Sequence, residues 1–367
     1  MKFNCNGLIL SDAATTVSKA CAVRTLTPVL ECIKITAKND SLILKAYDGE
    51  ISIEKTVKAD VIEEGETCVN GRFFTDFINK ISDKEVTVLS DEKGLEIRYD
   101  DSKSFIQAFP TMDFPAMRTE ETDKFFEIKE NKFKEIIAKT SFCSATDESR
   151  PILKGCLLEV KGGKMYSTAL DGFRMAVSEC DVEGGEEAKI ICPARTLNEI
   201  AKMLAGEDKN IQVFFSKNAL KVKVEETVLI SRLYLGEFVN KANIYPTAFT
   251  TIVTAKKSEF IDSLERASVL IRGDKNNLIL MDIKADGLNI TANSEVGNVS
   301  ESVKVAVSGK ELKIAMNAKY LLDALKALEE DTVVISLNRN DSPFTLKNES
   351  GKGSEYLILP LRPGMQS

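Results

Sequence analysis

Residues 125–142 have the sequence FFEIKENKFKEIIAKTSF, and residues 251–268 have the sequence TIVTAKKSEFIDSLERAS. Each stretch begins with alternating residues that are typical of a short strand. A polar turn follows, and apolar residues then recur at the spacing of a helix that lies on a core. The same strand–turn–helix unit therefore occurs twice, roughly 125 residues apart.

Segments with this helical spacing recur along the chain, roughly every 60 residues. We predict helices at residues 10–21, 71–82, 131–142, 194–204, 258–270 and 317–329. In the first of them, one face carries Leu10, Ala13, Ala14 and Val17. Three asparagines, Asn70, Asn131 and Asn317, stand where N-caps are expected.

Between these helices the hydrophobic pattern changes to a period of two, which predicts short antiparallel strands. The clearest strands are SLILKAYD (41–48), VTVLSD (86–91), LEIRYD (95–100), IQVFFS (211–216), LKVKVE (220–225), LNITAN (288–293) and TVVISLN (332–338). The glycine pairs Gly162–Gly163 and Gly184–Gly185 lie between polar residues and predict turns.

One helix with three or four strands makes a half-domain, and two halves make a domain of about 120 residues. The second halves share one design, seen in CVNGRFFTDFINKIS (68–82), ICPARTLNEIAKML (191–204) and IAMNAKYLLDALKAL (314–328). We therefore predict an α+β protein of three repeated domains at residues 1–120, 121–247 and 248–367. FPTMDFPAM (109–117) and the Tyr245–Pro246 region suit the linkers. Periodicity alone leaves open whether the repeats form a linear array or a closed ring.

The composition is that of a globular protein, with 43% hydrophobic and 29% charged residues among 367. No apolar run approaches the roughly 20 residues that span a bilayer. The N-terminus also lacks the pattern of a signal peptide. We expect a mature cytoplasmic protein with no membrane association.

The sequence offers little for catalysis, since it contains no histidine and no GxGxxG, P-loop or GxSxG motif. An enzyme that holds a metal on Asp171 and Glu159 remains an alternative, although Asp171 in a DG pair is typical of an Asx turn. We expect no catalytic residue, no metal and no cofactor.

The eight cysteines include no CxxC pair, which a zinc site or a disulfide framework would favour. They are Cys5, Cys21, Cys32, Cys68, Cys143, Cys156, Cys180 and Cys192. Several lie in apolar runs, so free buried thiols in a reducing compartment are predicted.

Positive charge is arranged on the predicted helices, although the formal net charge is −7. Arg195 and Lys202 are seven residues apart, as are Lys319 and Lys326, and each pair lies roughly 150° from its apolar stripe. Arg72 has a similar position in its helix, whereas Lys132 and Lys139 lie nearer the edge of the stripe. The fifth helix region adds Lys256, Lys257, Arg266 and Arg272. These cations suit either an ordinary solvated face or a sequence-independent phosphate-binding surface.

Six motifs, in order along the whole chain, resemble the sliding-clamp family of bacterial DNA polymerase III β subunits. They are RTLTPVLECIKI (24–35), FPTMDFP (109–115), RPILKGCLLEV (150–160), LDGFRMAV (170–177), PARTLNEIAKML (193–204) and YLILPLRP (356–363). The resemblance implies three domains of the DNA-clamp fold, each with two helices packed on antiparallel sheets. It also implies a head-to-tail homodimeric ring with the helices lining its pore.

Such a ring encircles double-stranded DNA without reading its sequence, tethers the replicative polymerase for processive synthesis and catalyses nothing itself. The implied DNA-binding residues are Arg24, Arg72, Lys132, Lys139, Arg195, Lys202, Lys319 and Lys326. Asp147 falls in the family's second contact loop but is acidic, so it is left out. The implied partners are the polymerase α subunit, the clamp loader and other proteins with a clamp-binding motif, in a nucleoid-associated cytoplasmic location.

The resemblance further implies a groove between the second and third domains that binds short peptides ending in hydrophobic residues. Its residues would be Leu153, Leu170, Gly172, Phe173, Arg174, Met175, Ile244, Pro343, Leu357, Ile358, Leu359, Pro360, Leu361 and Arg362. Arg174 and Arg362 would orient a polar anchor of the peptide. From the residues alone, YLILPL (356–361) is more typical of a buried strand than of a binding wall.

The chain departs from the family pattern in places that affect peptide preference. Leu170 replaces the usual Thr, Phe173 a frequent His, and EFVNKANIYP (237–246) lacks the Phe-Pro-Asp-Tyr core. The implied dimer seam joins Ile106 of the first domain to Val269 and Leu270 of the third. A scaffold that binds proteins but not DNA remains an alternative, and the sequence leaves open whether this is a main or an additional clamp.

Overall fold

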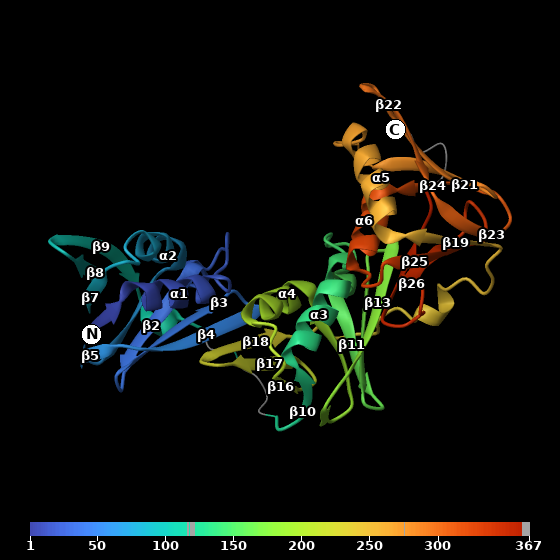
Figure 1. Cartoon of the computed structure of the whole chain (residues 1–367). Helices are drawn as coiled ribbons and strands as arrows, with labels where there is room; N and C mark the ends of the chain where they lie inside the picture. Colours follow the sequence, from blue (N-terminus) through green and yellow to red (C-terminus); the bar gives the residue numbers. More distant parts are fainter. Residues whose placement is uncertain (116, 118–121, 275, 362–367) are drawn as a thin grey trace. The chain divides into compact units, whose positions relative to one another are not determined.

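The computed structural model describes residues 1–115, 117, 122–274 and 276–361 (Figure 1). The described residues form six α-helices: α1 (Gly7–Ser18), α2 (Gly71–Lys80), α3 (Glu130–Thr140), α4 (Ala194–Met203), α5 (Lys257–Leu270) and α6 (Ala318–Ala327). Short 3-10 helices are η1 (Pro28–Glu31), η2 (Thr111–Asp113), η3 (Ser141–Cys143), η4 (Pro151–Lys154) and η5 (Lys241–Asn243). The six predicted helices are confirmed, with ends that shift by a few residues.

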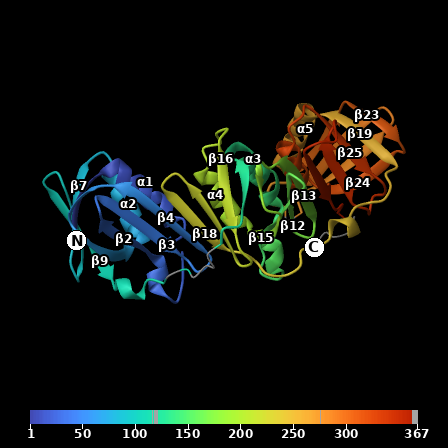
Figure 2. The ribbon, with the colours of Figure 1, turned by 90° about the horizontal axis from the view of Figure 1, so that it is seen from below.

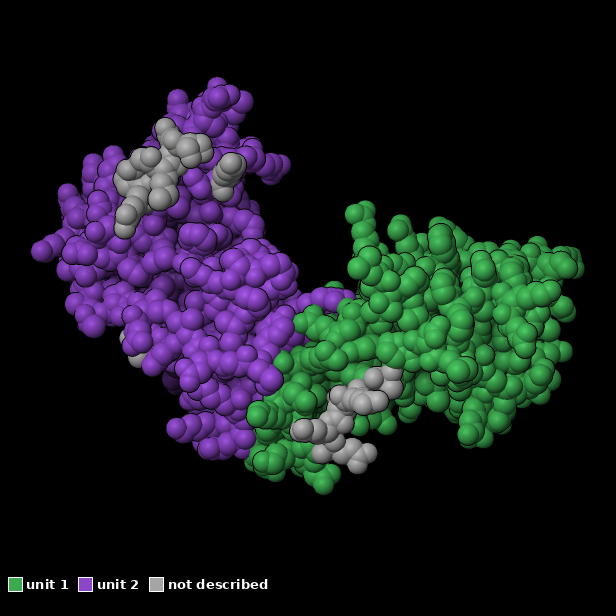
Figure 3. Space-filling model, turned by 180° about the vertical axis from the view of Figure 1, so that it is seen from behind, with its two compact units in different colours: residues 1–130, 184–186, 202–233 green, residues 131–183, 187–201, 234–367 purple. Residues whose placement is uncertain are grey.

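These elements follow one order three times along the chain: strand, helix, three strands, a short strand, and then strand, helix, three strands. The described residues divide into two compact units, drawn in different colours in Figure 3. The first unit comprises residues 1–130, 184–186 and 202–233, and the second comprises residues 131–183, 187–201 and the described residues from 234 onward. The strands of the second repeat are divided between a sheet of the first unit and a sheet of the second, so the boundary between the units passes through this repeat. The predicted domain limits stay a prediction.

A single antiparallel sheet runs through the first unit, in the order β14-β10-β16-β17-β18-β4-β3-β2-β6-β9-β8-β7-β1-β5. Strands from the first repeat are β1 (Lys2–Asn6), β2 (Cys32–Lys38), β3 (Ser41–Tyr47), β4 (Ile51–Lys58), β5 (Asp60–Glu63), β6 (Gly65–Asn70), β7 (Glu85–Ser90), β8 (Gly94–Tyr99) and β9 (Ser102–Phe109). The others are β10 (Phe125–Lys129), β14 (Gly184–Gly185), β16 (Asn210–Phe215), β17 (Ala219–Val224) and β18 (Thr227–Arg232). β4 and β18 join the two repeats, with Ile53 opposite Leu229.

The second unit contains two sheets, and Figures 1 and 2 label β13 and β25 of the larger one and β24 of the smaller one. The larger has the order β15-β11-β12-β13-β27-β26-β25-β19-β23. Its strands are β11 (Gly155–Lys161), β12 (Lys164–Leu170), β13 (Arg174–Asp181), β15 (Ala188–Pro193), β19 (Thr251–Lys256), β23 (Val305–Gly309), β25 (Thr332–Leu337), β26 (Phe344–Asn348) and β27 (Ser354–Ile358). The smaller sheet has the order β22-β21-β20-β24, formed by β20 (Leu278–Lys284), β21 (Gly287–Ser294), β22 (Gly297–Val303) and β24 (Leu312–Asn317).

The helices bury the apolar stripes predicted for them. Leu10, Ala13, Ala14 and Val17 of α1 are fully buried, and Leu321, Ala324 and Leu325 of α6 are buried to within 2% exposure. A stripe of this width removes apolar surface from water along one side and leaves the other side for polar residues. Each of the seven predicted strands coincides with a strand of the structure, and six of them extend one residue past its end.

Two of the three predicted N-caps are confirmed. The Asn70 side chain accepts from the Phe73 amide, and the Asn317 side chain accepts from the Lys319 and Tyr320 amides. The prediction of Asn131 as an N-cap is wrong, because α3 already begins at Glu130. The first helix begins earlier than predicted, because Asn6 caps it by accepting from the Leu8 amide.

Of the two glycine pairs, Gly162–Gly163 forms the predicted turn, with positive φ values of 59° and 75°. The prediction for Gly184–Gly185 is wrong, since this pair forms the short strand β14 beside β10. A Cβ at Gly185 would lie 2.4 Å from the Phe125 carbonyl oxygen, so a side chain would not fit there.

Candidate partner groove and helix-borne cations

An apolar cluster in the second unit collects five residues of the predicted groove. Leu153, Leu170, Met175 and Leu357 are nearly buried with Ala145, and Ile244 packs against them. Other residues packed against the cluster are Ile152, Val177, Phe238 and Tyr245. Leu153, Leu170 and Met175 belong to the second repeat, whereas Leu357 belongs to the third.

The turn between β12 and β13 forms one side of this cluster. Asp171 Oδ1 accepts from the Phe173 amide at 2.8 Å and from the Arg174 amide at 3.0 Å, which confirms the predicted Asx turn. Gly172 takes the positive φ of 94° that the turn requires. Phe173 is consequently 59% exposed, beside the buried Leu170 and Met175.

The other side is the end of β27 and the residues after it. Met175 lies opposite Leu357 in the antiparallel pair of β13 and β27, and the Leu359 amide donates to the Phe173 carbonyl at 2.8 Å. Leu357 and Ile358 are buried, whereas Leu359, Pro360 and Leu361 are half-buried, as is Pro343. YLILPL is thus a buried strand in its first half and a partly exposed wall in its second. Arg362 lies outside the described residues.

Arg174 lies beneath this turn and is only 9% exposed. Its guanidinium donates to Asp171 Oδ2 at 3.1 Å, to Asp323 Oδ2 at 2.7 Å and to the Phe142 carbonyl at 2.9 Å. It also stacks on the Tyr320 ring, 4.4 Å from the centroid. All three of its nitrogens therefore have internal partners, and its role in orienting a bound peptide stays a prediction.

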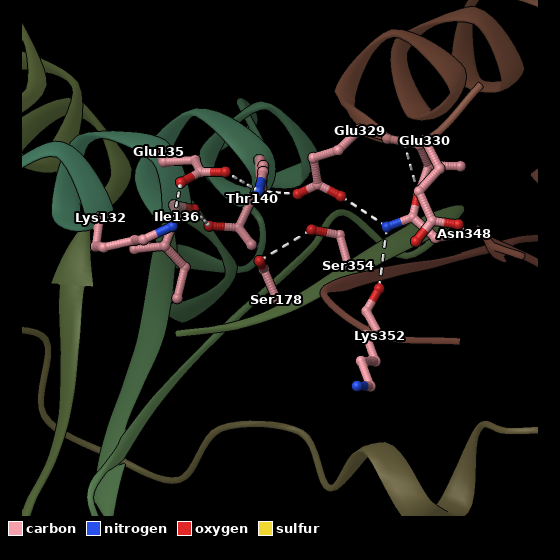
Figure 4. Close-up of polar contacts among 12 residues, drawn as sticks. Lys132, Glu135, Ile136, Thr140, Ser178, Glu329, Glu330, Asn348, Lys352 and Ser354 are labelled. Carbon is pink, nitrogen blue, oxygen red and sulfur yellow. Dashed lines mark hydrogen bonds and ion pairs between the residues drawn. The ribbon is translucent and has the colours of Figure 1, made fainter. Parts of the chain in front are cut away.

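A polar network joins α3 to the loops of the third repeat near this arginine (Figure 4). Lys139 forms ion pairs with Glu135 and Glu329, and Glu329 accepts from the Asn348 side chain at 2.6 Å. The Lys139 carbonyl accepts from the Tyr356 hydroxyl at 3.0 Å. The side chain of Lys139 is only 14% exposed, which agrees with its predicted position near the edge of the apolar stripe.

The other seven predicted DNA-binding cations are exposed, but several have an acidic neighbour. Arg24, Arg72, Lys132, Arg195, Lys202, Lys319 and Lys326 are all exposed. Lys319 pairs with Asp323 at 3.3 Å, Lys326 with Glu265 at 2.6 Å and Lys132 with Glu135 at 3.3 Å. Arg72 lies 3.8 Å from Asp76. The cations on these helices are thus partly neutralised in place, which favours weak and exchangeable phosphate contacts.

Asp171 and Glu159, the residues of the alternative metal site, each pair with a basic side chain. No group of three or more Cys, Asp or Glu residues in the described part of the chain could hold a metal ion. Glu159 instead pairs with Lys189 at 3.5 Å. The eight cysteines are free, which confirms that prediction. Within the described residues, no helix combines the length and apolarity that crossing a membrane would need.

Family models place the chain unambiguously. Residues 1–118 match the N-terminal domain of the DNA polymerase III β subunit, residues 127–240 its central domain and residues 242–362 its C-terminal domain. The chain belongs to the DNA polymerase III β-subunit family. Members of this family are β sliding clamps, and the chain is accordingly a DNA sliding clamp, a processivity factor rather than a catalyst.

Individual relatives of this clamp agree over nearly its whole length. The β sliding clamps of Staphylococcus epidermidis and Staphylococcus aureus are each 32% identical over 356 residues, covering 94% of both chains. Among solved structures, the Bacillus subtilis DNA polymerase sliding clamp superposes with a TM-score of 0.93 at 26% identity, covering 99% of both chains. A putative DNA polymerase III β subunit from Eubacterium rectale has a TM-score of 0.92 at 28% identity, covering 98% of this chain and 99% of the other.

Two residues that pack on the apolar cluster, and one that pairs with Arg174, were not predicted from the sequence. Phe238 and Tyr245 pack on the apolar cluster, yet they lie in the 237–246 loop that was noted only for its divergence. Their aromatic character within a polar loop was the available signal, since a loop aromatic usually needs an apolar surface to cover. Asp323 was also missed, because its partner Arg174 is 149 residues distant in sequence.

Proposed function

We propose that two copies of this chain close head to tail into a ring around duplex DNA. The observation that carries the proposal is a repeated strand pairing. β4 of the first repeat pairs with β18 of the second, and β13 of the second pairs with β27 of the third. In both cases the last strand of a first half pairs with the last strand of a second half.

The same rule leaves two equivalent strands over, β22 of the third repeat and β9 of the first. In the described part of the chain, β22 pairs only with β21, and residues 102–107 of β9 pair only with β8. Open edges of this kind invite pairing with another chain. Because one chain offers both edges, a head-to-tail seam can close into a ring, and the resemblance to sliding clamps implies that two copies close it.

The residues near these edges suit a seam. Phe105 of β9 is 60% exposed and Val269 of α5 is 59% exposed, which leaves apolar surface for a partner to cover. Ile106 and Leu270 are half-buried beside them. We therefore keep Ile106, Val269 and Leu270 in the proposed seam and add Phe105.

The proposed ring holds DNA through the exposed cations of its helices, namely Arg72, Lys132, Arg195, Lys202, Lys319 and Lys326, with Arg24 on a loop. Lys139 contributes mainly to the α3 network. Contacts to phosphate alone carry no sequence information, so they permit sliding. Partner proteins, including the polymerase α subunit and a clamp loader, would insert a peptide beside Leu153, Leu170, Met175 and Leu357.

Light scattering after gel filtration, at low micromolar concentration, tests the ring. We expect about 81 kDa, twice the 40.5 kDa of one chain. A stable mass of one chain would contradict the β9–β22 seam. It would favour the alternative of a clamp-fold scaffold that binds proteins but does not encircle DNA.

A further inference from the structure

Asp323 is a carboxylate on α6 that lies outside the groove cluster and makes two ion pairs. Its Oδ2 accepts from Arg174 Nη1 at 2.7 Å and from Lys319 Nζ at 3.3 Å. The side chain of Asp323 is 30% exposed, whereas that of Lys319 is 62% exposed. Asp323 therefore stands between a buried arginine and a solvent-facing lysine.

The buried side of this link leads directly to the groove. Arg174 is the last residue of the turn that presents Phe173, and its guanidinium also holds Asp171, whose Oδ1 forms the Asx turn. A nearly buried cation is stable only where its donors have well-placed acceptors. Asp171 and Asp323 are the two carboxylates that supply them.

The two carboxylates have different attachments. Asp171 belongs to the turn itself and would move with it, whereas Asp323 belongs to α6, which buries Leu321, Ala324 and Leu325 in the third repeat. Arg174 is thus anchored to a rigid element of another repeat by its shortest hydrogen bond. The aromatic ring of Tyr320, one turn earlier on α6, supports the same guanidinium at 4.4 Å.

We propose that Asp323 is a positioning residue of the partner groove, which fixes the Asp171–Arg174 turn by holding Arg174 against α6. This inference rests on the proposed groove. Asp323 does not touch the peptide; it sets the orientation of the turn that carries Phe173. A groove wall held in one orientation binds a peptide more tightly, because less ordering remains to be done on binding.

The first test needs no peptide. The chain contains no tryptophan, so Phe173→Trp introduces a single indole reporter on the turn. Its fluorescence anisotropy decay reports how far the turn moves on the nanosecond timescale. We expect Asp323→Asn to lower the limiting anisotropy of this reporter and Asp323→Glu to restore part of it. An unchanged decay in Asp323→Asn would overturn the proposal.

The matched control is Glu265→Gln, which removes another carboxylate that pairs with a lysine of α6, Lys326 at 2.6 Å. Lys319→Gln is a second control, because it removes the exposed partner of Asp323 and leaves the Arg174 contact in place. Both controls should leave the reporter unchanged. An equal effect of Lys319→Gln would mean that Asp323 acts through Lys319, against the proposal.

The second test measures the dissociation constant of a fluorescein-labelled decapeptide that ends in Leu-Phe, with residue 173 left as Phe. We expect Asp323→Asn to weaken binding about fivefold to tenfold and both controls to stay within about twofold. Unchanged binding in Asp323→Asn overturns the positioning role. If the unsubstituted chain itself does not bind the decapeptide, the proposed groove fails, and the anisotropy decay still decides whether Asp323 holds the turn.

Discussion

At the scale of single residues, burial raises the pKa of several thiols of this clamp. Burial raises the pKa of Cys156 to about 12, and burial followed by the charge of Asp181 raises that of Cys180 to about 12. Burial, with smaller effects from Cys32, Asp48 and Glu31, raises the pKa of Cys21 to about 12. A hydrogen bond from Cys68 lowers the pKa of Cys32, but Cys32 is fully buried.

Labelling with a disulfide reagent at pH 8 should therefore be slow in the folded protein. A thiol with a pKa near 12 is only about 10⁻⁴ thiolate at this pH, compared with about a quarter for a free cysteine. We expect all eight thiols to react at once after unfolding in guanidinium. Two or more thiols that react within seconds in the folded protein would contradict this account.

The sequence predicted residue roles where the deciding partner was local. Asp171 was assigned to an Asx turn from the DG pair, and its bonds reach only to Phe173 and Arg174. The roles of Arg174 and Lys139 could not be predicted in the same way. Their partners Asp323 and Glu329 lie on another repeat, and no spacing along the chain indicates that they meet.

At the scale of elements, the N-cap of α6 has two hydrogen bonds from one side chain. Asn317 accepts from the amides of Lys319 and Tyr320 at 2.9 and 3.2 Å, and it is 6% exposed. Two amides at a helix start that lack a partner in the helix are thereby satisfied. Because α6 carries Lys319, Tyr320 and Asp323, its first turn also supports the Arg174 contacts.

Asn317→Ala should lower the free energy of unfolding by about 1 kcal/mol, the usual cost of losing such a cap. Asn131→Ala provides the contrast, because Asn131 lies inside α3 and its Oδ1 has no hydrogen-bond partner. We expect that second change to be close to neutral. Urea unfolding followed by circular dichroism measures both, and equal losses would contradict the assignment of Asn317 as the cap.

Element boundaries were predictable only where local chemistry decides them. The apolar stripes located all six helices, because the core selects buried positions at the helical period. The prediction of Asn131 as an N-cap failed because α3 begins at the buried Glu130. The Glu130 side chain accepts from the Gly206 amide and pairs with Lys209. Gly184–Gly185 failed for a related reason, because pairing with β10 is a long-range contact.

At the scale of the whole molecule, the proposed seam predicts that an exposed phenylalanine holds two chains together. Phe105→Glu places a charge on the open edge of β9, where it would have to be buried in the ring. We expect the mass by light scattering to fall from two chains to one at low micromolar concentration. Ile62→Glu is the matched control, since Ile62 is 53% exposed on β5, which β8, β7 and β1 separate from β9 in the sheet. A dimeric Phe105→Glu protein would exclude this seam.

The repeat was predictable from sequence, whereas ring closure was not. Six helices and the alternating strands indicate three similar domains, but linear and closed arrangements satisfy the same pattern. Ring closure is inferred from the resemblance to sliding clamps and from the pairing of β4 with β18 and of β13 with β27. Net charge was equally uninformative, because a value of −7 coexists with exposed cations on the helices.

Those cations support a last prediction, on how the proposed ring holds DNA. Arg195 and Lys202 on α4 are exposed, and reversing both charges should weaken binding to a short duplex that can thread the ring. Each phosphate neutralised contributes to a salt-dependent affinity that lies in the 10⁻⁴–10⁻⁶ M range for non-specific binding. We expect Arg195→Glu with Lys202→Glu to weaken binding at 50 mM salt by about tenfold or more and to flatten its salt dependence.

Lys221→Glu with Lys223→Glu makes the matching change of net charge on β17, where both lysines are exposed on a strand rather than on a helix. Fluorescence anisotropy of a labelled duplex, titrated from 50 to 200 mM salt, compares the two double variants. The strand variant should stay within about twofold of the unsubstituted protein, because its charges would lie outside the pore and be screened from the DNA over roughly 10 Å. Equal weakening by both would mean that net charge alone governs binding, and the helices would lose their proposed role as the DNA-facing surface.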